Sequence, residues 1–144
     1  MILVDANILI YAKFNDLPQH FGARRWLQEQ FNSPGRVGIP WQSLLAFLRV
    51  STNPRVFGRP LSIGSAWEQV LEWIDHPQTW IPEPTDDHAE VLGTILAGVQ
   101  ATANLIPDAH LAAIAIEHGL TVCSADADFA RFPGVTWVNP LQNS

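Results

Sequence analysis

The chain contains a single cysteine, Cys123, among its 144 residues. One cysteine excludes a disulfide framework and any zinc or iron–sulfur site that needs several thiolates. Long hydrophobic runs are also missing, because no stretch approaches the roughly 18 apolar residues of a transmembrane helix. The N-terminus has no basic region and reaches Asp5 too early for a signal peptide. Since 47% of the residues are hydrophobic, the chain is not intrinsically disordered. We expect a cytoplasmic protein without membrane contact that folds residues 1–144 as a single domain.

Charged residues are scarce, and basic residues most of all. Eight Lys and Arg stand against 14 Asp and Glu, which gives a net charge of −6. A protein that holds nucleic acid by broad electrostatic attraction is usually basic. A nucleic-acid partner of this chain must therefore meet a local basic patch or a site neutralised by metal. The low charged fraction, 15%, fits either a surface covered by a partner or a compact core rich in tryptophan.

Short β-branched runs alternate with amphipathic segments along the chain. We expect strands at 1–4, 36–39, 79–82, 120–123 and 135–138. Between them we expect helices at 7–14, 18–31, 41–52, 62–76, 85–103, 107–118 and 127–132. This alternation predicts an α/β fold with a mostly parallel, roughly five-stranded sheet and helices on both faces. Right-handed crossovers then place the carboxyl ends of the strands along one edge.

The 62–76 helix has apolar residues on more than one face. A core-facing stripe of Ile63, Trp67, Val70, Leu71 and Ile74 would leave Trp73 exposed. We therefore expect Trp73, together with Phe14 and Leu17, to form an apolar groove for a partner. The alternative is that these three side chains only fill a small core.

Carboxylates gather at the predicted strand ends. Asp5 follows the first strand, Asp126 and Asp128 follow the 120–123 strand, and Asp108 lies in the first turn of the 107–118 helix. Two like charges about 4 Å apart repel by roughly 4 kcal/mol at an effective dielectric near 20, so such a group is tolerable when it binds a hard cation. Carboxylates are ligands for Mg²⁺ or Mn²⁺, which assist phosphodiester hydrolysis.

Each carboxylate also has a structural interpretation. Asp108 could complement a helix N-terminus, Asp126 could cap the 127–132 helix, and Asp128 could be an ordinary first-turn acid. Asp5, placed directly after a buried strand, is the hardest of the four to explain structurally. A shared site becomes the simpler interpretation because three separate coincidences would otherwise meet on one edge.

The chain resembles PIN-domain ribonucleases, and more closely the VapC toxins of prokaryotic toxin–antitoxin pairs. The resemblance covers nearly the whole chain and rests on five segments in order: 3–10, 40–57, 108–113, 124–129 and 139–141. It implies a three-layer α/β/α PIN fold and Mg²⁺- or Mn²⁺-dependent endoribonuclease activity on RNA. It also implies a homodimer and inhibition by a cognate VapB-type antitoxin.

The resemblance assigns roles to individual residues. Asp5, Asp108 and Asp126 would be catalytic and would hold the metal together with Asp128. Asn7 and Ser124 would orient ligands or water. Apart from the resemblance, the position of three arginines at the end of the third helix and in the turn after it predicts that they bind RNA phosphates: Arg49, Arg55 and Arg59. The alternative is that Arg49 pairs internally with a carboxylate and that Arg55 and Arg59 are ordinary surface charges.

The sequence departs from the family pattern at one position. A glutamate usual on the third helix falls on Leu44 when the 49–53 segment sets the register. Either Asp128 or water fills the gap, or the protein binds metal weakly or not at all.

Two other functions of the chain stay open. One is an interaction module that lost its activity. The other is a phosphatase of the haloacid-dehalogenase type, although Asn7 stands where that class has a second aspartate.

Overall fold

A parallel sheet forms the centre of the molecule. The computed structural model describes residues 1–142. Its five strands lie in the order β3-β2-β1-β4-β5, and all neighbouring pairs are parallel. The strands are β1 (Ile2–Val4), β2 (Val37–Gly38), β3 (Thr79–Trp80), β4 (Thr121–Cys123) and β5 (Thr136–Val138). All five expected strands are therefore present, each shortened by one or two residues.

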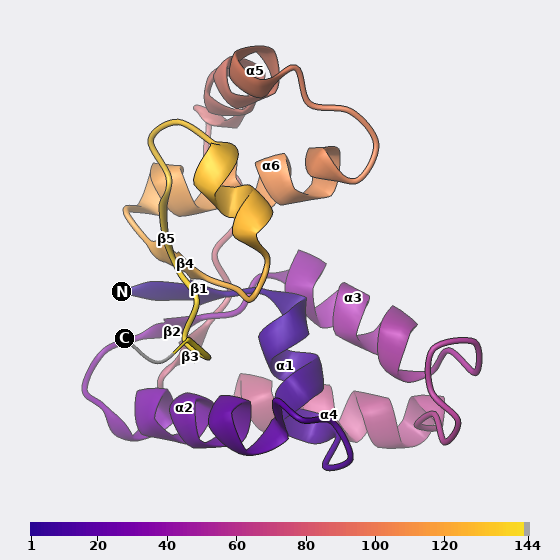
Figure 1. Cartoon of the computed structure of the whole chain (residues 1–144). Helices are drawn as coiled ribbons and strands as arrows, with labels where there is room; N and C mark the ends of the chain where they lie inside the picture. Colours follow the sequence, from indigo (N-terminus) through magenta and orange to yellow (C-terminus); the bar gives the residue numbers. More distant parts are fainter. Residues whose placement is uncertain (143–144) are drawn as a thin grey trace.

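Helices cover both faces of this sheet and make three layers (Figure 1). The molecule has two hydrophobic cores. One contains Val4 and side chains of four helices, and the other contains Leu3 and side chains of the remaining helices. The first group is α1 (Ala6–Lys13), α2 (His20–Asn32), α3 (Trp41–Ser51) and α4 (Ile63–Asp75). The second is α5 (His88–Val99), α6 (Leu105–His118) and the short 3₁₀ helix η1 (Ala127–Arg131). The α/β/α fold is confirmed.

Local chemistry explains several element boundaries. A Cβ on Gly38 would meet the Ile2 carbonyl oxygen at 2.8 Å, so only glycine lets β2 pair this closely with β1. The side chain of Ser62 accepts a hydrogen bond from the Ser65 amide and begins α4. Gly119, with φ of +68°, ends α6 in the left-handed region. Helix α5 ends at Val99, earlier than expected, because Gln100 adopts φ of +49°.

The expected core-facing stripe of α4 is only partly correct, because Val70 and Ile74 pack into the core but Ile63, Trp67 and Leu71 do not. Trp73 is only 6% exposed and packs edge-to-face against Phe47, whereas Trp67 and Leu71 are both 41% exposed. Phe14 is also buried, with its ring stacked 3.9 Å from that of Phe57. The helix is apolar on two faces, and periodicity alone does not say which face meets the sheet. Phe14 and Trp73 therefore form no exposed apolar groove, and Trp73 instead lines a pocket of about 420 Å³ between α1, α2 and α4 together with polar side chains such as Lys13, Arg24 and Gln69.

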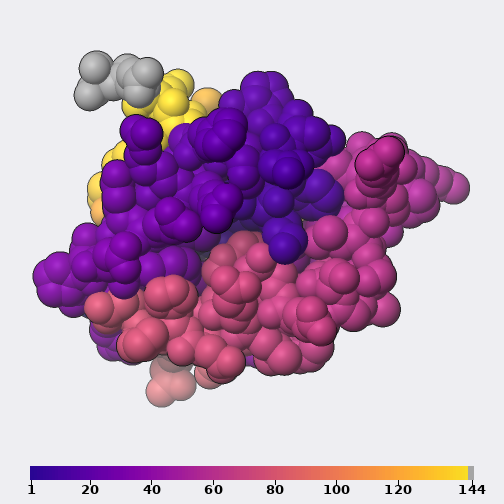
Figure 2. All heavy atoms as spheres, turned by 90° about the horizontal axis from the view of Figure 1, so that it is seen from below, coloured from indigo at the N-terminus to yellow at the C-terminus, as the bar shows by residue number. Residues whose placement is uncertain are grey.

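Helix α4 lies on the underside of the molecule beside α2 (Figure 2). Its outer face carries a stripe of apolar side chains spaced four residues apart, Ile63, Trp67 and Leu71, which we call the α4 stripe. Trp67 stacks on Trp41 of α3 with ring centroids 6.4 Å apart. Within residues 1–142, no helix has both the length and the apolar character needed to span a bilayer.

Candidate metal centre

Asp5 is held rigidly at the carboxyl end of the central strand. Its Oδ1 accepts a hydrogen bond from the Ala6 amide at 2.8 Å and caps α1. Its Oδ2 accepts one from the Ser124 hydroxyl at 2.7 Å. The Asn7 amide in turn donates to the Ser124 oxygen at 3.0 Å, and the Asn7 oxygen accepts from the Ala125 amide at 3.2 Å. Asn7 and Ser124 thus join the ends of β1 and β4 and orient the Asp5 carboxylate.

Three more carboxylates meet beside Asp5. One oxygen from each of Asp108, Asp126 and Asp128 lies within 4.8 Å of the others. Asp126 uses its Oδ1 to cap η1, accepting from the Asp128 amide at 2.9 Å. The expected capping role of Asp126 is therefore real, but it occupies one oxygen only. The structure brings together acids that lie 18 to 20 residues apart in sequence.

Electrostatic repulsion in this cluster is strong. Burial and the charges of Asp126, Asp5 and Asp128 raise the pKa of Asp108 from 3.8 to about 7. Burial is also the main cause that raises the pKa of Asp5, against the hydrogen bonds from Ser124 and Ala6 that lower it. The nearest basic group to Asp128 is Arg131, 3.9 Å away, and both side chains are about half exposed. Such an exposed pair contributes little, so the cluster lacks a strong internal counter-charge.

The cluster fits a divalent cation. Its donor atoms are all carboxylate oxygens, the ligand type that Mg²⁺ and Mn²⁺ prefer. Bringing one oxygen of each of three acids within 4.8 Å is unfavourable unless positive charge compensates it. Asp108, Asp126 and Asp128 are the residues that would hold the ion, with Asp5 at the edge of the same cluster.

Leu44 does not face this centre. It is fully buried in the core between the sheet and α1–α4, so a glutamate at this position would not reach the four aspartates. The face of α3 turned toward α6 instead carries Gln42 and Ala46, four residues apart. The Gln42 amide donates to the Pro107 carbonyl at 2.7 Å. Together with Pro107, these two side chains line a groove of about 550 Å³, which we call the α3–α6 groove.

The three arginines expected to bind RNA are exposed. Arg49 lines the α3–α6 groove, whose wall includes Pro107, the residue before Asp108. No carboxylate of residues 1–142 lies within 4.0 Å of Arg49, Arg55 or Arg59. An internal ion pair of Arg49, the structural alternative, is therefore not formed.

A buried polar chain behind the α3–α6 groove went unnoticed in the sequence. The Glu117 side chain is 1% exposed and accepts hydrogen bonds from the Thr85 amide and hydroxyl at 2.8 and 2.6 Å. His88 lies 2.6 Å from the other Glu117 oxygen, and its second ring nitrogen lies 2.9 Å from His110. These hydrogen bonds lower the pKa of Glu117, although burial opposes them. The spacing of His110 and Glu117, two helical turns, is the signal that could have revealed the pair.

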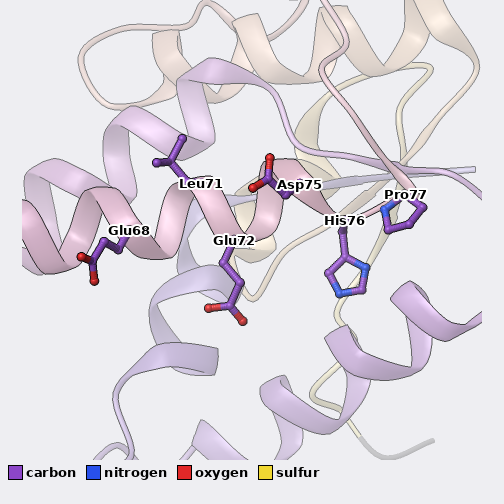
Figure 3. A pocket seen from close by; sticks show the side chains of 6 residues that line it. All are labelled: Glu68, Leu71, Glu72, Asp75, His76 and Pro77. Carbon is purple, nitrogen blue, oxygen red and sulfur yellow. The ribbon is translucent and has the colours of Figure 1, made fainter.

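A second acidic surface lies along α4 but does not form a metal site. Figure 3 shows Glu68 and Glu72 on one side of the helix and Asp75, with Leu71, on the other. These carboxylates diverge, and within residues 1–142 the acids that converge with metal-ligand spacing are Asp108, Asp126 and Asp128.

Comparison with known proteins identifies the family of this chain. The PIN-domain family matches residues 2–135. Ribonuclease VapC37 of Mycobacterium tuberculosis is 43% identical over 140 residues, covering 97% of each chain. Ribonuclease VapC43 of the same species is 39% identical over 141 residues, covering 98% of this chain and 96% of that one. A chain of a toxin–antitoxin complex from Klebsiella pneumoniae superposes with a TM-score of 0.64 at 20% identity, covering 97% and 98% of the two chains.

The fold and the four aspartates define a protein of the PIN type. The chain belongs to the PIN-domain family and, within it, to the VapC proteins. This membership sets aside the haloacid-dehalogenase alternative.

Proposed function

We propose that the protein is a divalent-metal-dependent endoribonuclease and the toxin of a toxin–antitoxin pair. The observation that carries the proposal is the meeting of Asp108, Asp126 and Asp128 beside Asp5 at the carboxyl edge of the sheet. The names of the VapC relatives, which are ribonucleases, support it. Mg²⁺ or Mn²⁺ bound there would supply an activated water and stabilise the leaving oxygen of a phosphodiester.

The chain's own residues prepare this chemistry in three ways. Asp108, Asp126 and Asp128 bind the cation, and Asp128 supplies a carboxylate that partly compensates for the absence of the family glutamate. Ser124 and Asn7 hold Asp5 in one orientation through bonds of 2.7 to 3.2 Å, so that little reorganisation is needed when the cation binds.

The decisive test is cleavage of RNA by the purified chain with and without metal. We expect endonucleolytic products with Mn²⁺ or Mg²⁺ and none in excess EDTA. Saturable Mn²⁺ binding, measured by calorimetry, should accompany the activity. A chain that binds no Mn²⁺ at millimolar concentration and leaves RNA intact would instead be an interaction module without activity.

RNA binding should depend on the exposed arginines of α3 and of the turn that follows it. Arg49→Ala or Arg55→Ala is expected to weaken RNA binding and to reduce the slope of log K against log salt by about one unit each, because each guanidinium neutralises one phosphate. Metal affinity should not change. Affinities are measured at several salt concentrations, with Arg25→Ala on the outer face of α2 as the control. A larger loss from Arg25→Ala would place the RNA on the other face.

We further propose that a VapB-type antitoxin binds the α4 stripe. Ile63, Trp67 and Leu71 form an exposed apolar row. Figure 3 shows the carboxylate of Asp75 on the same side of the helix as Leu71, with Glu68 and Glu72 on the opposite side. A row of apolar side chains with an acidic border fits an amphipathic helix that carries basic residues. A second copy of this chain, with its net charge of −6, fits that border less well. The homodimer stays a separate prediction that sedimentation velocity tests.

Disrupting the α4 stripe should separate inhibition from activity. Trp67→Asp places a charge in the apolar row and is expected to weaken antitoxin binding by at least about 100-fold, the loss typical of a central aromatic contact. RNA cleavage by the free toxin should persist with an unchanged kcat, although KM can rise because Trp67 stacks on Trp41. Binding is measured by calorimetry with the purified antitoxin, and Phe21→Asp, at an exposed position of α2, is the control. Unchanged affinity in Trp67→Asp would locate the antitoxin elsewhere.

A further inference from the structure

A second groove opens beside the α3–α6 groove. It has a volume of about 260 Å³ and apolar walls formed by Trp41, Pro82 and Pro84. We call it the proline groove. Gln42 and His110 line both grooves and therefore stand between them. The Gln42 amide is bonded to the carbonyl of Pro107, and Asp108 follows Pro107, so both grooves lie next to a residue that leads into the acidic cluster.

We propose that the proline groove receives one unstacked nucleobase of the RNA next to the cleaved phosphate. This inference rests on the proposed ribonuclease function and specifies which part of the protein recognises a base of the RNA substrate. Single-stranded RNA is recognised by bases that stack on aromatic rings and form hydrogen bonds with their edges. Trp41, 38% exposed, supplies the ring, and the two prolines supply flat apolar surface opposite the polar pair.

His110 is fixed in place for such a contact. Its Nδ1 lies 2.9 Å from His88, and His88 lies 2.6 Å from the buried Glu117. The Glu117 carboxylate, which also accepts two hydrogen bonds from Thr85, anchors this chain in the core. The remaining nitrogen of His110, Nε2, makes no hydrogen bond within residues 1–142.

The charges around the groove favour a base over a phosphate. Glu83 is part of the lining, and its carboxylate repels phosphate but accepts hydrogen bonds from amino groups. The Gln42 nitrogen already donates to Pro107, which leaves the Gln42 oxygen as an acceptor. Two acceptors match the exocyclic amino groups of adenine, cytosine and guanine, whereas uracil presents only carbonyl oxygens at the corresponding positions. The groove should therefore disfavour uracil.

The test uses the full chain with Mn²⁺ and a pool of 5′-labelled single-stranded RNAs randomised around the cleavage site. Sequencing of the cleaved ends is expected to show uracil depleted at one position adjacent to the cut. The depletion should fall by roughly 3- to 10-fold in His110→Ala and in Glu83→Gln, the range that one lost hydrogen bond allows. Trp41→Ala should raise KM for all four bases, because stacking tolerates any base.

Glu90→Gln, an exposed acid of α5 outside both grooves, is the control and should keep the base profile of the unmodified protein. Mn²⁺ affinity and melting temperature, measured for every variant, separate a local effect from a damaged fold. Two results would overturn the base subsite and leave the ribonuclease function standing. The first is a flat base profile in the unmodified protein. The second is an unchanged profile in His110→Ala and Glu83→Gln together with an unchanged KM in Trp41→Ala. Absence of any metal-dependent cleavage would overturn both.

Discussion

Asparagine in place of Asp108 is expected to stop RNA cleavage and, at the same time, to stabilise the metal-free protein at pH 8. The substitution keeps the shape of the side chain and removes one negative charge from the cluster. Loss of a residue that holds the ion should lower cleavage by more than about 100-fold, since removing even the groups that support metal ligands costs about 10- to 100-fold. The gain in stability comes from the repulsion that raises the pKa of Asp108 to about 7.

The pH dependence of stability follows from the direction of that shift. A carboxyl whose pKa is higher in the folded state binds protons more tightly there, so its stabilising contribution is complete below about pH 4. The contribution is lost as the pH rises through about 7. Asp108 is partly exposed, and solvent screening reduces the effect to about 1–2 kcal/mol. Asp108→Asn should remove this pH dependence and raise the melting temperature at pH 8 by about 3 °C or more.

Thermal unfolding between pH 4 and pH 8 in EDTA measures the stability difference, and the RNA assay with Mn²⁺ measures activity. Asp16→Asn, an exposed aspartate before α2, is the matched control and should change neither quantity. Saturating Mn²⁺ should reverse the order of stability at pH 8, because only the unmodified protein binds the ion tightly. Full cleavage by Asp108→Asn, or a variant less stable than the unmodified protein at pH 8, would contradict the proposed role.

The number of strands, their parallel direction and the acidic edge could be predicted because they follow from short-range patterns, whereas the strand order could not. The short apolar runs around Leu3 and Val122 form buried strands. Because these strands are parallel, the residues that follow them, Asp5 and Asp126, lie at the same edge of the sheet. The details of the contacts there could not be predicted. The sequence does not reveal that the Ser124 hydroxyl bridges Asp5 and Asn7, or that three of the four acids converge more closely with one another than with the fourth.

Helix orientation was predicted less well for a physical reason. Helix α4 has enough apolar residues for two faces, and burial of Ala66 and Trp73 rather than Trp67 depends on what α3 and β3 present to it. The Glu117–His88–His110 chain was missed because its members lie on two helices, 22 and 29 residues apart. Pairings of this kind depend on how α5 docks on α6, which the periodicity of a single helix does not encode.

Placing a glutamate on α3 is expected to have large effects on folding or on Mn²⁺ affinity, depending on the position chosen. Leu44 is 0% exposed, and Leu44→Glu would bury a carboxylate among apolar side chains. We expect a loss of about 4 kcal/mol or more, enough to leave much of a marginally stable domain unfolded. Ala46 lies half a turn further along α3 and lines the α3–α6 groove beside Pro107. Ala46→Glu should fold normally, since the loss of helix propensity is only about 0.5 kcal/mol.

The added carboxylate at position 46 should bring a further oxygen ligand toward the cluster and tighten Mn²⁺ binding by about 10-fold, because the affinity of oxygen-ligand sites rises with the number of charged ligands. Calorimetric titration with Mn²⁺ measures the affinity, and circular dichroism follows the fold. Ala97→Glu introduces the same side chain at an exposed position of α5 and should leave Mn²⁺ affinity unchanged. The opposite result would be a Leu44→Glu protein that folds and binds Mn²⁺ more tightly while Ala46→Glu does not. In that case α3 would turn its Leu44 face toward Asp108. This orientation contradicts the one that the Gln42–Pro107 hydrogen bond defines.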